Sequence, residues 1–65
     1  MATFDVKGMT CNHCVRAVTN AVQEIDAQAR VEIDLSSGSV QVESSAPVAA
    51  IAQAITDAGY EAKPR

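Results

Sequence analysis

Two stretches of the chain carry apolar residues at the spacing of an amphipathic helix, and alternating stretches flank both of them. The first predicted helix covers residues 13–25. The second covers residues 47–58, with Ser45 or its neighbour as cap, Pro47 in the first turn and Gly59 as the stop. The apolar stripes are Cys14, Ala17, Val18, Ala21, Val22 and Ile25 in the first helix and Val48, Ile51, Ala52 and Ile55 in the second.

The segments around these helices are typical of short strands, because apolar and polar residues alternate along most of them. The predicted strands are residues 3–7, 31–35, 40–43 and 60–63. A short connection containing Gly38 separates the second strand from the third, and glycine can supply the positive φ of a tight turn. The second and third strands are therefore predicted to pair as an antiparallel hairpin. The last strand is predicted to lie at an edge, and Pro64 is expected to end its ladder.

The order strand, helix, strand, strand, helix, strand predicts an α+β, ferredoxin-like fold. In it a four-stranded antiparallel sheet carries both helices on one face. With 65 residues the chain is expected to form one domain over residues 1–65. A core of this size leaves room only for a small, local functional site.

Charge and hydropathy exclude several classes of partner. Five Lys and Arg stand against eight Asp and Glu, for a net charge of −3 and a pI of about 4.7. This balance disfavours nucleic acids and anionic membranes. No apolar run approaches the roughly 18 residues of a membrane span, so no membrane insertion is expected. The N-terminus lacks the features of a secretion signal, and we expect a cytoplasmic protein.

The chemistry of the chain is concentrated in Cys11 and Cys14, its two cysteines, which lie where the first strand-to-helix loop meets the first helix. Two cysteines this close in a reducing compartment suggest a metal or redox site rather than a disulfide framework. The N-terminus of a helix lowers the pKa of a nearby thiol and so favours the thiolate that binds metals. Thiolates select soft ions such as Cu(I), and two ligands suit a linear ion.

Spacing alone does not decide between a metal site and a redox dithiol, which also uses two cysteines separated by two residues. A structural zinc site requires four ligands, whereas this chain has only two thiols and one histidine close together in the sequence. His13 lies between the cysteines, so its ring is expected to point away from their meeting point. We interpret it as an exposed loop residue rather than a ligand of the monomer.

The context of the cysteines carries a more specific signal. Residues 8–14 read GMTCNHC between a strand and a helix, and residues 57–60 read DAGY after the second helix. On these motifs, and over essentially the whole chain, the sequence resembles the heavy-metal-associated domain family, in particular its stand-alone bacterial copper chaperones. The resemblance implies that Cys11 and Cys14 bind one Cu(I) at an exposed edge. It also implies transfer by ligand exchange to the metal-binding domain of a copper-transporting P-type ATPase. Such a carrier is not an enzyme.

The resemblance also suggests roles for neighbouring residues. Met9 is expected to pack beneath the loop rather than bind metal. Tyr60 is expected beside the loop, where shielding of the site and simple packing as a half-buried ring are both open. Thr10 stands where zinc-exporting relatives carry an acidic residue, which favours Cu(I). His13 would become relevant in a metal-bridged homodimer, whose formation the sequence leaves open.

Three rival interpretations remain. The loop is also similar to that of mercury-scavenging carriers, although these are exported. The second rival is an excised N-terminal regulatory domain of a copper ATPase, which the short tail after Tyr60 and the lack of a linker disfavour. The third rival, a thiol oxidoreductase, would need a substrate groove and a proline facing the dithiol, and the sequence suggests neither.

Overall fold

The computed structural model describes residues 2–10 and 12–65, in which the predicted order of strands and helices is confirmed. The strands are β1 (Ala2–Lys7), β2 (Arg30–Asp34), β3 (Ser39–Glu43) and β4 (Glu61–Pro64), and the helices are α1 (Asn12–Ile25) and α2 (Val48–Asp57). None of the helices in these residues is both long and apolar enough to cross a membrane.

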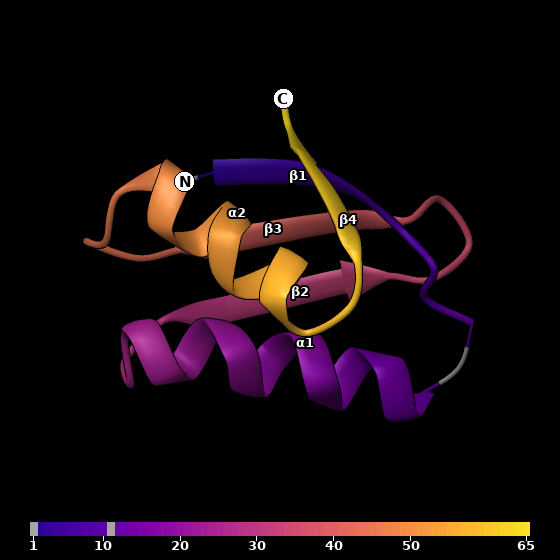
Figure 1. The fold of residues 1–65 in the computed structure, drawn as a ribbon, viewed down its shortest axis with the longest axis horizontal. Helices are drawn as coiled ribbons and strands as arrows, with labels where there is room; N and C mark the ends of the chain where they lie inside the picture. The colour runs from indigo at the N-terminus through magenta and orange to yellow at the C-terminus, as the bar shows by residue number, and fades with distance from the viewer. Residues whose placement is uncertain (1, 11) are drawn as a thin grey trace.

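The strands form one sheet in the order β2-β3-β1-β4, and each neighbouring pair is antiparallel. Both helices lie on the same side of this sheet, so the other face is open (Figure 1). The predicted ferredoxin-like fold is therefore confirmed. Because β1 lies between β3 and β4, the loop that follows it leaves from the middle of the sheet.

The buried core lies between the sheet and the helices. It draws alternate residues from β1 and β3 and residues at helical spacing from α1 and α2, as the two periodicities require, and Ala29 from the segment before β2. In the described part of the chain its members are Phe4, Val6, Val18, Val22, Ala29, Val40, Val42, Ile51 and Ile55. Two residues of the predicted apolar helix stripes lie outside this core: Ile25 is 48% exposed and Val48 is 46% exposed. Ile25 is the last residue of α1 and Val48 is the first residue of α2.

Most predicted boundaries shift by one residue, and three of the differences concern particular residues. Leu35 lies in the turn after β2 rather than in the strand. Pro47 precedes α2 as its N-cap with extended ψ of 143° and no side-chain cap hydrogen bond, so the predicted serine cap is wrong. Pro64 does not end the ladder: it pairs with Phe4, and the next amide, of Arg65, donates to Thr3 O at 2.8 Å. A proline is tolerated there because β4 is an edge strand.

A side-chain network joins the end of α1 to the segment after β3, at the end of the sheet opposite the loop after β1. The Ser44 hydroxyl donates to Asp26 Oδ2 at 2.7 Å, and the Gln28 amide donates to Asp26 Oδ1 at 3.0 Å. These bonds to the ionised form hold the pKa of Asp26 below its ordinary value of 3.8, with the Ser44 bond as the largest cause. The network thus fastens this end of the molecule without contributing to the metal loop.

Candidate metal centre

The predicted metal loop connects β1 to α1, and its described residues are 8–10 and the first residues of the helix. In Figure 1 this segment lies at the same end of the molecule as the turn between β2 and β3. Cys11, one of the two predicted ligands, lies outside the described residues. Cys14, the other, is the third residue of α1 and is partly exposed. Its thiol is therefore carried by the first turn of a helix.

The Cys14 sulfur lies among polar groups of the loop that precedes it. Its Sγ is 3.9 Å from the Thr10 hydroxyl and 4.0 Å from the Gly8 carbonyl oxygen. The first backbone N–H groups of a helix have no partner within the helix, so this end favours negative charge. The position therefore suits a partly exposed, metal-binding thiolate.

Gly8 is a point of close approach between the loop and the C-terminal part of the chain. Its φ is +99°, a conformation that residues other than glycine rarely adopt. A Cβ at this position would lie 3.5 Å from Cδ1 of Tyr60, so the tyrosine ring lies against the loop backbone. Tyr60 is therefore beside the loop, as the resemblance implies.

Tyr60 reaches this place through the way α2 ends. Gly59, with φ of +102°, donates from its amide to Thr56 O at 3.0 Å, and the Tyr60 amide donates to Ile55 O at 3.3 Å. This pair of bonds is a Schellman motif, in which a glycine past the last turn reverses the chain. The reversal turns Tyr60 back onto the core, where its ring is half-buried.

The other predicted site residues take different positions. Met9 is half-buried and packs against the core, which places it below the loop surface. His13 and Thr10 are both exposed. Among residues 2–10 and 12–65, no three His, Cys, Asp or Glu side chains come together as a metal cluster. The described residues therefore supply no ready-made zinc site of four ligands.

The structure also holds a contact that the sequence analysis missed. Gly38, predicted only as a turn residue, lies against the backbone of β1: its carbonyl oxygen accepts a hydrogen bond from the Val6 amide at 2.8 Å. In the sequence, the glycine itself was the one indication that another backbone could approach this position closely. Its tertiary partner could not be inferred from residues near it in the sequence.

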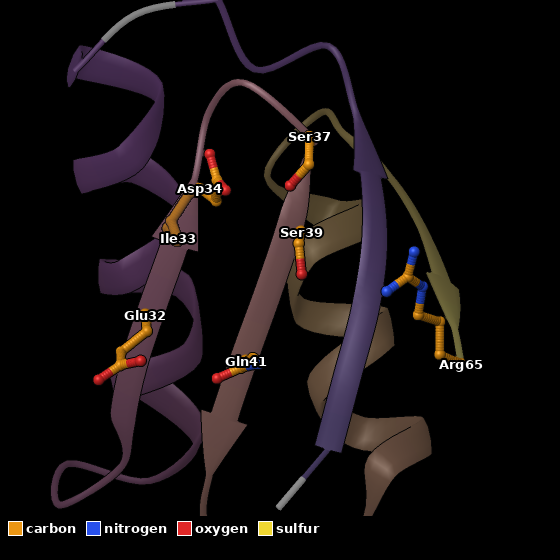
Figure 2. A pocket seen from close by; sticks show the side chains of 7 residues that line it. All are labelled: Glu32, Ile33, Asp34, Ser37, Ser39, Gln41 and Arg65. Carbon is orange, nitrogen blue, oxygen red and sulfur yellow. The ribbon is translucent and has the colours of Figure 1, made fainter.

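A recess of about 350 Å³ lies on the open face of the sheet. Figure 2 shows its polar side chains on β2, on β3 and at the turn between them, with the Arg65 guanidinium on the other side of β1. They are Glu32, Asp34, Ser37, Ser39, Gln41 and Arg65. Oxygen donors and a guanidinium do not suit a soft ion. The chemistry of this recess is therefore distinct from that of the thiol loop.

Comparisons with known proteins agree with this geometry. Residues 3–61 match the model of the heavy-metal-associated domain. The COP-associated protein of Helicobacter felis is 52% identical over 58 residues, which cover 86% of this chain and 88% of the relative. The copper chaperone CopZ of Bacillus subtilis is 44% identical over 62 residues, covering 91% and 90%. The copper chaperone Atx1 of Synechocystis PCC6803 superposes with a TM-score of 0.93 at 38% identity, covering 97% of this chain and all of the other.

Proposed function

The chain belongs to the heavy-metal-associated domain family, and we propose that it is a cytoplasmic copper chaperone whose cargo is one Cu(I) ion bound by Cys11 and Cys14. The observation that carries this proposal is the Cys14 thiol on the exposed first turn of α1, reached through the Gly-Met-Thr-Cys loop. The relatives named as copper chaperones, which match this chain over most of its length, support copper as the cargo.

Ligand chemistry supports the monovalent ion. Each cysteine gives up its proton on binding, and the two thiolates form a low-coordinate site that suits Cu(I). The described residues add no carboxylate or imidazole cluster that would raise the ligand count towards that of a zinc site. The same soft ligands bind Hg(II), so a mercury carrier is the main competing interpretation.

Delivery would proceed by ligand exchange with a similar metal-binding domain of a copper-transporting P-type ATPase. A thiolate of the partner joins the two-coordinate ion, one bond from copper to a cysteine of this chain then breaks, and that cysteine is reprotonated. A second exchange completes the transfer. Copper keeps its oxidation state, and no bond of a substrate is made or broken, so the protein acts as a carrier rather than an enzyme.

The neighbouring residues would support this site without binding the ion in the monomer. Met9 would hold the loop from below, because it packs against the core. Tyr60 would shield one side of the loop, because its ring lies against Gly8. His13 is exposed and would reach copper only in a metal-bridged homodimer, in which thiols of a second copy complete the coordination.

The proposal is tested by anaerobic titration of the reduced protein with Cu(I), Zn(II) and Hg(II) against a competing chelator. We expect tight binding of one Cu(I), weak binding of Zn(II), and strong loss of Cu(I) affinity in Cys11→Ser and in Cys14→Ser. Either variant binding Cu(I) like the parent would contradict the ligand assignment. Weak Cu(I) binding with a readily cycling disulfide would favour an oxidoreductase. Native mass spectrometry of the loaded protein identifies any dimer.

A further inference from the structure

The turn between β2 and β3, residues 35–38, has a well-defined shape. The Gly38 amide donates to Asp34 O at 2.9 Å and closes the turn. The amide and hydroxyl of Ser36 both donate to Asp34 Oδ1, at 3.0 Å and 2.6 Å. Figure 2 shows Asp34 and Ser37 at this turn, above the open face of the sheet. Bonds of this kind between an aspartate and the backbone two residues later stabilise a turn locally.

This turn continues the contact between β3 and β1 beyond the end of their ladder. The last register pair of the two strands is Asp5 with Ser39. One residue further on, the Val6 amide donates to Gly38 O at 2.8 Å. A Cβ on Gly38 would lie 2.8 Å from Val6 O, and its φ is +71°. Any side chain there would force the turn and the Val6 backbone apart, because a backbone carbonyl cannot move aside as a flexible side chain can.

The contact is made close to the metal loop. Val6 lies two residues before Gly8, whose carbonyl oxygen is 4.0 Å from the Cys14 sulfur. On the other side of β1, Val6 pairs with Ala62 and Lys7 pairs with Glu61. The last residues of β1 are thus held by β4 on one side and by Gly38 on the other.

We propose that Gly38 is a positioning residue for the metal loop, acting through the Val6 backbone; this inference rests on the proposed function of the loop. The absence of a side chain lets the turn fasten the end of β1. The loop then leaves the sheet from a fixed point and holds its shape before copper arrives. A side chain at position 38 would displace either the turn or the end of β1, and in both cases the hydrogen bond from the Val6 amide to Gly38 O is lost. The loop must then be ordered at the moment of binding, which lowers affinity.

The test compares Gly38→Ala with Val42→Ala, a variant that weakens the core at the other end of the sheet. Val42 is 1% exposed and pairs with Ala2 and Val31, away from the loop. The first readout is hydrogen exchange of the amides of residues 8–10 in the metal-free protein, and the second is Cu(I) affinity by chelator competition. We expect faster exchange and about tenfold weaker Cu(I) binding in Gly38→Ala, and neither change in Val42→Ala.

A second variant tests whether the turn positions the metal loop if Gly38→Ala does not fold. Asp34 is exposed, and Asp34→Ala removes the side-chain bonds of the turn without placing a Cβ against Val6. In Asp34→Ala we also expect faster exchange of residues 8–10 and weaker Cu(I) binding, with both changes smaller than in Gly38→Ala. Exchange of residues 8–10 as slow as in the Val42→Ala control would overturn the positioning role. Failure of the parent protein to bind Cu(I) would overturn the proposed function instead, while the exchange result would still decide the role of Gly38.

Discussion

The Thr10 hydroxyl lies 3.9 Å from the Cys14 sulfur, which makes it a candidate for tuning the site without binding the metal. A hydroxyl near a thiolate stabilises its charge, but a sulfur contact at this distance is weak. We therefore expect Thr10→Val to weaken Cu(I) binding by only about threefold, at the low end of the range for a single hydrogen bond. Chelator competition measures the change.

The control for that variant is Thr56→Val, which makes the same substitution at an exposed position of α2. It should leave both Cu(I) affinity and stability unchanged. Equal affinities for Thr10→Val and the parent protein would show that the hydroxyl does not influence the bound ion.

Asp26 gives the protein a specific dependence on acid. The Ser44 hydroxyl, and to a smaller extent the Gln28 amide, lower the pKa of Asp26. The ionised form of Asp26 therefore stabilises the fold at pH above the ordinary value of 3.8. That stabilisation is lost as the pH falls through the lower pKa of the folded state. Ser44→Ala should raise the pKa of Asp26 and lower stability at neutral pH, while changing stability less in acid.

An NMR titration of the Asp26 carboxyl group and thermal unfolding at neutral pH and below pH 3.8 would check this expectation. Ser45→Ala is the matched control, because Ser45 is an exposed neighbour that bonds Asp26 only through its backbone. An unchanged Asp26 pKa in Ser44→Ala would show that the hydroxyl is not the cause.

At the scale of elements, two residues near the C-terminal end of α1 differ in burial although both belong to its apolar stripe. Val22 is fully buried against the sheet, whereas Ile25, one turn later, is 48% exposed. We expect Val22→Ala to lower the free energy of unfolding by about 2 kcal/mol through lost burial and a residual cavity. Ile25→Ala should change it by no more than about 0.5 kcal/mol.

Chemical denaturation measures both values, and an unchanged denaturant dependence would confirm that the two variants unfold from the same native state. A loss for Ile25→Ala as large as that for Val22→Ala would mean that Ile25 is covered in solution. Cu(I) affinity should be unaffected in both variants, because neither residue lies in the loop.

Most of the elements were predictable from the sequence because they carry a clear local pattern of apolar and polar residues. Helical spacing identified α1 and α2, and the alternation of β1 and β3 matches their buried residues Phe4, Val6, Val40 and Val42. The ends were less predictable, because they depend on the rest of the fold. Pro64 stays in β4 because that strand lies at the sheet edge, and the sequence could not show which of its sides lacks a neighbour.

At the scale of the whole molecule, the metal end is built from segments far apart in the sequence. Tyr60 lies against Gly8 of the loop, and the turn at residues 35–38 bonds Val6, two residues before the loop. Both contacts arise because β1 lies between β3 and β4 in the sheet. The place of the Cys14 thiol at a helix start followed from the local strand, loop and helix pattern. The support from Gly38 did not, because it arises only when the sheet forms.

This arrangement determines how far copper can stabilise the fold. Two residues separate the cysteines, so the unfolded chain can also bring both sulfurs to Cu(I). Copper therefore raises stability only by the difference between folded and unfolded affinities. If the ordered loop favours binding tenfold, the gain is about 1.4 kcal/mol. For a domain of this size the unfolding temperature would then rise by about 5–10 °C.

Thermal unfolding of the metal-free and Cu(I)-loaded protein measures that rise, and Cys14→Ser should abolish it. A peptide containing residues 6–18 provides an independent value, because it holds both cysteines without the sheet. Its Cu(I) affinity should be about tenfold below that of the folded protein, in agreement with the thermal shift. Equal affinities and no thermal shift would mean that the fold presents the two sulfurs to a partner without strengthening their hold on copper.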